Sequence, residues 1–344
     1  MKIETFVLDT PPVIGGRSLR MAAKRYRRAR QAPLEDGVTL LMLHGLGQHK
    51  EQWEPVIEKL YALQSGGETL PRIREVWSFD WQSHGESAVL NEDALEGDPT
   101  SSPVDRWADA VAVFTKSNFV EGHLLVGIGY SSGTMALMVS TTHFAPDQCP
   151  YIGIILVEPT IMDQETWDTK RNEIQPAFAM VTNAVNHRRD LWSSKEAAHQ
   201  FFLGRFPWNT WDPRVVALFV KHALRDVKDK DGNSCVSRSC PKIHEANAFQ
   251  VNMKVTWDAA EQVAKLSGVV PIHVILGEEV DLMPGAIRDS AIDTTKGRRV
   301  DSITRIPNVG HAVVQQLPDV LSSTISDLLS VMILPDSRQV SSHL

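Results

Sequence analysis

Residues 124–138, with the sequence LLVGIGYSSGTMALM, join an apolar run to a G-x-S-x-G motif and a second apolar segment. The first run predicts a buried strand over residues 124–128, and the segment after the motif predicts a helix over residues 132–142. Small residues around Ser131 suit a sharp strand-to-helix turn, because the two backbones crowd together there. Such a turn exposes the central hydroxyl, so Ser131 is the candidate nucleophile, and the amide of Ser132 can face a developing oxyanion.

The rest of the chain repeats this alternation of buried strands and helices. Further strands are predicted at residues 38–43, 73–79 and 152–157, with helices at 49–63 and 104–116. After a long interruption, strand patterns return at residues 272–276 and 302–306, followed by a final helix at 317–332. This alternation predicts an α/β fold with a mostly parallel, twisted sheet and helices on both faces.

The interruption predicts an inserted helical cap. Its residues show amphipathic, tryptophan-containing helical patterns, one of them opening at Pro213, and no convincing central strand. The predicted division is a core over residues 1–159, the cap over 160–265, the rest of the core over 266–335, and a flexible tail over 336–344. The basic residues at 24–30 are interpreted as an exposed strand face near the N-terminus rather than an anion site.

Two further segments carry groups that a nucleophilic serine requires. The glycine-rich turn HGLG at residues 44–47 follows the first core strand, and its Leu46 amide can supply a second oxyanion donor. His311 follows the last predicted strand, and this late position gives the chain order serine, acid, histidine. His311 is therefore the predicted general base, whereas His84, after an early strand, is assigned to packing or loop hydrogen bonds.

Two carboxylates compete for the task of orienting the His311 ring. Glu158 directly ends the strand at residues 152–157, and Asp281 follows the strand at residues 272–276 in an acid-rich loop. Both lie at carboxyl ends of strands, where open α/β sheets place their chemistry. Glu158 is favoured, because a charged residue that directly ends a buried apolar strand is not expected to be an ordinary exposed surface charge. Asp281 remains the alternative.

These motifs resemble those of the α/β-hydrolase superfamily over essentially the whole chain. The stretches LMLHGLGQ, FDWQSHGES, GIGYSSG, ILVEP and VGHAV occur in the superfamily's order. The cap stretches WNTWDPRVVALFVKHAL and CPKIHEANAF are similar to a fungal toxin-biosynthesis branch, whose members often carry peroxisomal tails and include acyl-CoA hydrolases. The resemblance implies Ser131 as nucleophile, His311 as base and a carboxylate at Glu158, where aspartate is more usual. It also implies an oxyanion hole formed by the Leu46 and Ser132 amides.

A serine at this turn predicts acyl transfer through an acyl-enzyme, which needs no metal or organic cofactor. Aromatic residues gather in or beside the predicted cap and suit a bulky hydrophobic acyl group, although each can equally pack the cap's own helices. They are Trp167, Trp192, Phe201, Phe202, Phe206, Trp208, Trp211 and Trp257. Basic residues in the same segment could meet the phosphates of coenzyme A at the pocket mouth, namely His187, Arg188, Arg189, Arg214, Lys221 and Arg225.

Three functions follow as hypotheses. The favoured one is a thioesterase acting on a large hydrophobic acyl-CoA in secondary metabolism. The alternative is an ester or lactone hydrolase of a hydrophobic small metabolite, with the same serine, acid and histidine. The third is a ligand-binding protein that only uses the fold, and the intact set of three residues argues against it.

Composition and termini limit the partners and the location. The net charge of −7 argues against a nucleic-acid surface, and no apolar run is long enough to span a bilayer. The N-terminus lacks a signal-peptide core, so a soluble protein outside the usual secretory route is expected. Ser342, His343 and Leu344 differ from the Ser-Lys-Leu peroxisomal signal by one basic residue. A peroxisomal import receptor is therefore a predicted partner, and the cytoplasm is the expected location otherwise.

Two metal-like or redox-like features carry no site. Cys149, Cys235 and Cys240 have neither a CxxC nor a zinc spacing and are interpreted as reduced thiols. The segment VKDKDGNSCVSR has the glycine of a calcium loop, but Val227 and Arg238 stand where carboxylates are required. It is interpreted as a polar turn.

Overall fold

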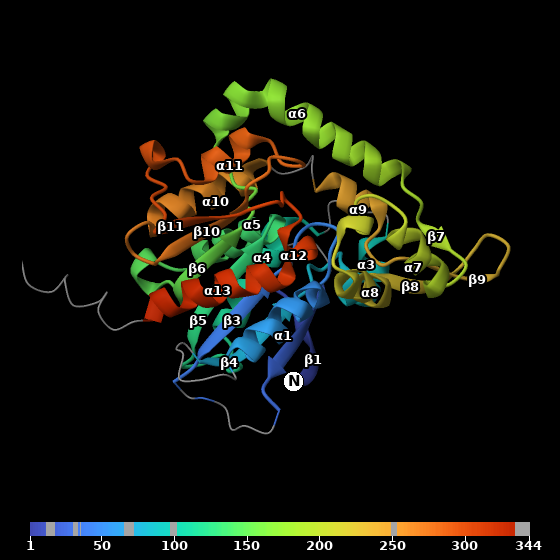
Figure 1. The fold of residues 1–344 in the computed structure, drawn as a ribbon, viewed down its shortest axis with the longest axis horizontal. Coiled ribbons are helices and arrows are strands. Elements are labelled where there is room, and N and C mark those ends of the chain that lie inside the picture. Colours follow the sequence, from blue (N-terminus) through green and yellow to red (C-terminus); the bar gives the residue numbers. More distant parts are fainter. Residues whose placement is uncertain are drawn as a thin grey trace, which may run out of the picture.

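The structure, a computed structural model, describes residues 1–11, 18–29, 34, 36–64, 72–96, 102–248 and 253–333. A central sheet is flanked by helices, and the long helix α6 (Gln164–His187) arches over the top of the view in Figure 1. A group of short strands and helices lies at the right of the same view, beyond the far end of α6. The predicted tail, including Ser342, His343 and Leu344, lies outside the described residues.

The main sheet confirms the predicted α/β fold. In spatial order its described strands are β1 (Lys2–Asp9), β2 (Arg20–Arg27), β4 (Ile73–Phe79), β3 (Val38–Leu43), β5 (Leu124–Tyr130), β6 (Tyr151–Val157), β10 (Ile272–Gly277) and β11 (Ser302–Ile306). From β4 to β11 the pairing is parallel, whereas β1 and β2 add an antiparallel edge. The parallel strands are the apolar runs that the sequence predicted, because such strands are covered on both faces.

Helices cover both faces of this sheet. On one face α4 (Val104–Thr115), α5 (Ser132–Ser140) and α10 (Met253–Leu266) share a core, and on the other α1 (Glu54–Leu63) packs with α13 (Pro318–Ile333). The short helices of the core are η1 (Lys50–Trp53), α2 (Gly85–Leu90), α3 (Glu92–Leu95), η2 (Thr141–His143), η3 (Pro146–Gln148), α11 (Gly285–Ala291), η5 (Thr294–Lys296) and α12 (Val313–Gln316).

Register in the sheet brings three chain segments to one edge. Gly129 of β5 pairs with Leu43 of β3 and with Leu156 of β6, so the carboxyl ends of these strands are level. The turn after β3, the turn after β5 and the residue after β6 therefore emerge side by side. Sheet topology alone places the HGLG turn, Ser131 and Glu158 at this common edge.

The inserted segment is not purely helical, and this corrects the expectation of a strandless cap. Besides α6 it contains α7 (Lys195–Leu203), η4 (Trp208–Thr210), α8 (Pro213–His222) and α9 (Lys242–Asn247), with β7 (Leu191–Trp192), β8 (Leu224–Lys228) and β9 (Ser234–Arg238). The three strands form an antiparallel sheet in the order β7–β9–β8. They are short and partly polar, so they lack the apolar runs that mark strands of the main sheet.

The predicted end of the insert at residue 265 falls inside α10, a helix of the core. Val255, Ala259 and Val263 on this helix belong to the same buried cluster as α4, α5 and the main sheet. An amphipathic pattern reveals that a helix buries one face but not what that face packs against. The sequence therefore could not assign α10 to the core.

The basic N-terminal segment is a strand, as predicted, but its cations are paired rather than freely exposed. Lys24 lies 3.1 Å from Glu51 and 3.2 Å from Glu54, and Arg25 lies 3.1 Å from Glu4 on the neighbouring strand β1. Arg27 also contacts Glu4. Strand β1, which supplies this carboxylate, has no counterpart among the predicted elements.

Candidate active site

Ser131 lies at the tip of a strained turn between β5 and α5. Its φ of 52° and ψ of −122° are values that residues other than glycine rarely adopt. A Cβ at Gly129 would approach the Gly133 carbonyl oxygen to 2.6 Å, and a Cβ at Gly133 would approach the Leu43 carbonyl oxygen to 2.5 Å. Both glycines are therefore sterically required where strand and helix cross, as the motif predicts.

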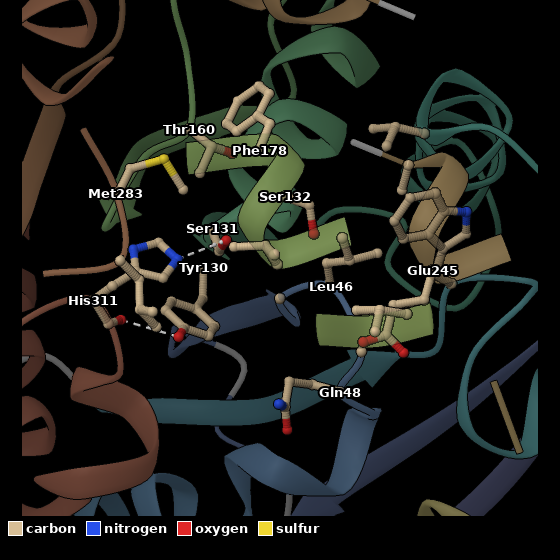
Figure 2. A pocket seen from close by; sticks show the side chains of 18 of the residues that line it. Leu46, Gln48, Tyr130, Ser131, Ser132, Thr160, Phe178, Glu245, Met283 and His311 are labelled. Carbon is tan, nitrogen blue, oxygen red and sulfur yellow. Dashed lines mark hydrogen bonds between the residues drawn. The ribbon is translucent and has the colours of Figure 1, made fainter. Parts of the chain in front are cut away.

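The three favoured residues form one hydrogen-bonded chain. His311 Nε2 lies 3.0 Å from Ser131 Oγ (Figure 2), and His311 Nδ1 lies 3.1 Å from Glu158 Oε2. Because a carboxylate only accepts, Nδ1 carries the proton and Nε2 is free to accept from the serine hydroxyl. All three side chains are buried, and Ser131 and His311 line a cavity. This is the geometry of a serine activated by a histidine that a carboxylate orients.

Asp281 also contacts His311, but it binds the backbone of that residue and not its ring. Its Oδ1 accepts the backbone N–H of His311 at 2.8 Å, and its carboxylate fills the space where Gly310 has no side chain. The imidazole nitrogens are bonded to Ser131 and Glu158 instead. The two carboxylates that the sequence left in competition are thus both used, one on the ring and one on the backbone of the same histidine.

The Glu158 carboxylate is held by donors that contact Oε1, the oxygen that does not face His311. Its φ of 49° is another left-handed value, which turns the side chain off the end of β6. Oε1 accepts the Gly277 amide and lies 3.4 Å from Nη2 of the buried Arg288. With Oε1 occupied in this way, Oε2 faces Nδ1 of His311. Arg288 was not predicted as a site residue, because it lies in the short helix α11 after an irregular loop that follows β10.

Tyr130 holds the backbone of the loop that carries His311. Its hydroxyl lies 3.0 Å from the His311 carbonyl oxygen and 3.1 Å from Gln315 Oε1, and can donate to either. In Figure 2 the ring lies directly beneath the Ser131–His311 pair. The variable second position of the G-x-S-x-G motif is therefore a positioning residue in this chain, which the motif alone does not reveal.

The predicted oxyanion donors are both available. Among the described residues, neither the Leu46 amide nor the Ser132 amide has a hydrogen-bond partner. A Cβ at Gly45 would stand 2.7 Å from the Tyr130 ring, so a glycine is needed for the Leu46 turn to approach Ser131. The two unpaired N–H groups come from separate chain segments, and Leu46 and Ser132 line the same cavity as Ser131, as the predicted oxyanion hole requires.

The buried ring of His44 holds the HGLG turn through two hydrogen bonds. His44 Nε2 accepts the Trp81 amide at 3.0 Å, so its Nδ1 carries the proton and donates to the Gly45 carbonyl at 2.7 Å. Burial lowers the pKa of His44 to about 3, which keeps the ring neutral. His84 stacks on Trp81 and contacts Ser83 Oγ at 3.1 Å, in agreement with its predicted packing role.

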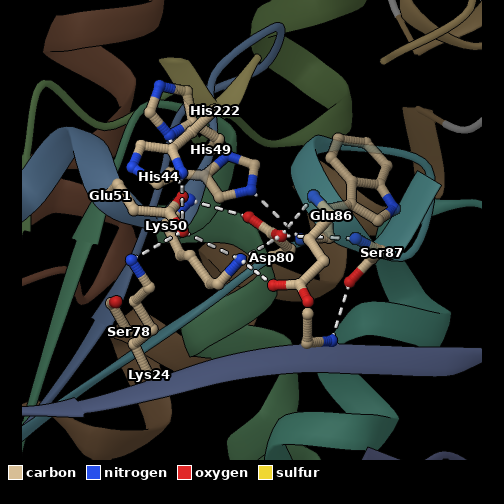
Figure 3. Close-up of polar contacts among 12 residues, drawn as sticks. Lys24, His44, His49, Lys50, Glu51, Ser78, Asp80, Glu86, Ser87 and His222 are labelled. Atoms are coloured by element: carbon tan, nitrogen blue, oxygen red, sulfur yellow. Dashed lines mark hydrogen bonds and ion pairs between the residues drawn. The ribbon is translucent and has the colours of Figure 1, made fainter. Parts of the chain in front are cut away.

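A buried ionic network anchors the segment that follows the HGLG turn (Figure 3). Lys50 Nζ lies 2.9 Å from Asp80, 2.9 Å from Glu86 and 3.1 Å from Glu51. Burial alone would lower the pKa of Lys50, but these carboxylates raise it, so the ammonium stays charged. His222 of α8 lies 3.5 Å from Glu51, which links the insert to the same network. The network thereby anchors the chain next to Leu46, whose amide is a predicted oxyanion donor.

A cavity of about 360 Å³ opens over these groups and is lined mostly by apolar side chains. Leu46, Ser131, Ser132 and His311 form part of its floor, and Phe178 and Met283 lie above the Ser131–His311 pair in Figure 2. Its apolar lining suits an apolar group. The insert supplies part of the wall, as expected for a cap.

Only some of the aromatic residues predicted to contact a hydrophobic acyl group line the cavity. Trp208 and Trp211 line the cavity, together with Phe178 and Phe219, which the sequence had not singled out. Trp192 and Phe202 are buried in the insert's own core, and Phe206 is 71% exposed. Trp167 stacks with Phe178, and none of Trp167, Phe201 and Trp257, all described residues, lines the cavity. Packing within the insert thus accounts for several of them.

The basic residues predicted to meet coenzyme A do not gather at the cavity. Arg214 pairs with Asp212 and Asp319, and Arg225 pairs with Glu92. The Arg189 guanidinium lies over the rings of Trp192 and Phe201. Of the six residues predicted, all of which are described, Arg188 alone lines the cavity. The structure adds Arg238 and Glu245 beside it, which the sequence could not place because β9 was not predicted.

Other possible sites are not supported within the described residues. These residues contain no group of three or more His, Cys, Asp or Glu that could hold a metal ion, and no helix suited to crossing a membrane. In the rejected calcium loop, Asp229 accepts hydrogen bonds from Asp231 and Asn233 of its own turn. Cys149, Cys235 and Cys240 carry free thiols.

Curated relatives include a Type I acyl-CoA thioesterase, mpaH', of Penicillium brevicompactum, 28% identical over 216 residues. The match covers 61% of this chain and 45% of the relative, so the chain spans about half the length of the curated relatives it matches. A thioesterase of the same description from Penicillium roqueforti is 26% identical over the same length.

Solved structures with the same fold include two hydrolases. The peroxisomal alpha-beta-hydrolase Lpx1 of Saccharomyces cerevisiae superposes with a TM-score of 0.71 at 17% identity, over 100% of this chain and 92% of that one. An esterase of Mycobacterium tuberculosis has a TM-score of 0.60 at 18% identity, over 94% of this chain and 92% of that one. The alpha/beta hydrolase family matches residues 40–324, which hold the candidate site and nearly all of the parallel part of the main sheet but not β1 and β2. The chain therefore belongs to the alpha/beta hydrolase family.

Proposed function

We propose that the chain is a serine hydrolase that cleaves the thioester of a hydrophobic acyl-CoA. The observation that carries this proposal is the continuous hydrogen-bonded chain from Ser131 through His311 to Glu158 beside two unpaired amides. In the proposed reaction, Ser131 Oγ attacks the acyl carbonyl while its proton passes to His311 Nε2. The carbonyl oxygen becomes an oxyanion, and the Leu46 and Ser132 amides stabilise it.

The second half of the reaction returns the site to its starting state. Collapse of the tetrahedral intermediate breaks the carbon–sulfur bond, and the thiol leaves with the proton held by His311. Water then enters, gives a proton to His311 and attacks the acyl-enzyme, which releases a carboxylic acid and restores the Ser131 hydroxyl. Glu158 keeps the ring in the required tautomer and stabilises the imidazolium in both halves.

The fungal relatives and the cavity support the thioester and the hydrophobic acyl group. The curated relatives are named acyl-CoA thioesterases, and Trp208, Trp211 and Phe178 give the cavity an apolar wall. Because the cavity walls are mostly apolar, the acyl group is the part of the substrate that they suit. A thioesterase acting on a hydrophobic acyl-CoA is the function that these observations favour.

The deciding experiment measures thiol release from acyl-CoAs of increasing bulk, beside matched oxygen esters, with Ser131→Ala as the blank. We expect thiol release that requires Ser131 and exceeds cleavage of the oxygen esters. Hydrolysis of the oxygen esters alone would establish the ester or lactone hydrolase instead. That alternative is favoured by one observation: Arg214 and Arg225, which were predicted to meet the phosphates of coenzyme A, pair with carboxylates of the protein instead.

We also propose import into peroxisomes through Ser342, His343 and Leu344. The proposal holds where these residues form the carboxyl end of the natural protein, since the import receptor reads an exposed end. A fluorescent fusion carrying the tripeptide at its end should enter peroxisomes, and deletion of the tripeptide should leave it diffuse. Peroxisomal fluorescence that survives the deletion would contradict this assignment.

A further inference from the structure

One side of the cavity is ionic, in contrast to its apolar walls. Arg188 follows the last residue of α6, Arg238 ends β9, and Glu245 lies on α9, and all three line the cavity. In Figure 2 Glu245 lies across Leu46 from His311, on the opposite side of the view. None of the three has a role in the proposed reaction.

The charges in this cluster do not balance at the cavity wall. Arg188 Nη1 lies 2.7 Å from Glu245 Oε1, and Arg238 Nη2 lies 3.5 Å from Glu245 Oε2. Burial would raise the pKa of Glu245, but the two arginines lower it, so the residue is a carboxylate at neutral pH. One carboxylate therefore faces two guanidinium groups. Asp190 approaches Arg188 Nε to 3.5 Å but does not line the cavity.

Two guanidinium nitrogens of the arginines have no partner among the described residues. The two side chains are only 10% and 5% exposed, yet Arg188 Nη2 and Arg238 Nε are buried without a hydrogen bond or ion pair, whereas Arg188 Nε has the ion pair with Asp190. Arg238 also donates a hydrogen bond to the Gly47 carbonyl at 2.6 Å, which connects the cluster to the HGLG turn. Buried, unsatisfied cationic donors are costly, and a ligand that supplies an anion removes that cost.

We propose that Arg188 and Arg238 bind a carboxylate carried by the acyl group, so that the preferred substrates are thioesters whose acyl part bears a second acid. This inference rests on the proposed function for the thioester itself. A phosphate of coenzyme A is the other anion on such a substrate, but it is attached to a polar nucleotide, and the cavity walls around this cluster are mostly apolar. A single carboxylate matches the paired guanidinium groups in charge and geometry.

Kinetics on truncated thioesters test the substrate preference. N-acetylcysteamine thioesters of dicarboxylic acids of graded length lack every phosphate, and their terminal methyl esters lack the second charge. We expect kcat/KM to favour the free acid at one chain length, and Arg188→Gln to lower that value about 10- to 100-fold while the methyl ester changes less than about twofold. Arg189→Gln, a neighbouring cation that does not line the cavity, is the matched control and should change neither.

Product binding supplies a readout that does not depend on turnover. Free dicarboxylic acids should raise the Tm of the Ser131→Ala protein more than their monomethyl esters do, and Arg188→Gln should remove the difference. Glu245→Gln frees both guanidinium groups and should strengthen the diacid effect, a change in the opposite direction that general destabilisation cannot produce.

Each contrary result has a defined meaning. Equal binding of diacids and methyl esters, or an equal loss of both in Arg188→Gln, would overturn the subsite. A dependence on Arg188 confined to coenzyme A thioesters would assign the anion to phosphate and also overturn it. Failure of every thioester to react would count against the proposed function, and the binding measurement would still decide the subsite.

Discussion

Replacement of Ser131 by alanine should lower kcat by about 10⁵-fold, whichever acyl substrate the protein hydrolyses. The reason is that Oγ is the atom hydrogen-bonded to His311 Nε2 at 3.0 Å, so its removal leaves no group to form the acyl-enzyme. Alanine keeps the Cβ and hence the same backbone strain at φ 52°, so the fold should survive. Single-turnover hydrolysis together with thermal unfolding of the variant measures both expectations.

Ser132→Ala is the matched control for this substitution. Ser132 is the adjacent serine, and its Oγ is buried without a hydrogen bond among the described residues. The substitution retains the backbone amide that faces the developing oxyanion, so activity should fall by less than about tenfold. A large loss in Ser132→Ala with activity retained in Ser131→Ala would exchange the roles of the two serines.

The sequence predicts the framework of this site because the framework depends on local patterns. Apolar runs mark the parallel strands, and the two glycines beside Ser131 mark a crossing too tight for any Cβ. Chain order then separates His311 from His84 without three-dimensional information. Level strand ends follow from parallel pairing, which is why Ser131 and Glu158 were both predicted at one edge.

What the sequence misses depends on contacts between distant segments. The strands of the insert, such as LRDVK at Leu224–Lys228, alternate in burial only because they pair with each other. Without them Arg238 has no predicted position, and its proximity to Glu245 and to the Gly47 carbonyl stays hidden. Pairing of Arg214 and Arg225 with acids far along the chain is hidden for the same reason.

Sequence analysis favoured Glu158 as the acid and kept Asp281 as the alternative, and a pair of amide substitutions tests their roles. Glu158→Gln should lower kcat by about 10³- to 10⁴-fold, because a glutamine can turn its NH₂ group toward Nδ1 and favour the wrong imidazole tautomer. It would also remove the charge that stabilises the imidazolium. Asp281→Asn should cost less than about tenfold, since its amide oxygen can still accept the His311 backbone N–H.

The comparison is informative because both carboxylates contact the same histidine. If the ring contact at 3.1 Å matters, the loss follows Glu158; if loop placement matters most, the loss follows Asp281. Asp281→Ala separates these further, because it removes the acceptor of the His311 amide and should disturb the loop without changing the tautomer. Near-full activity in Glu158→Gln with a large loss in Asp281→Asn would make Asp281 the acid of the site. The ring would then have to turn away from Glu158 in the active protein.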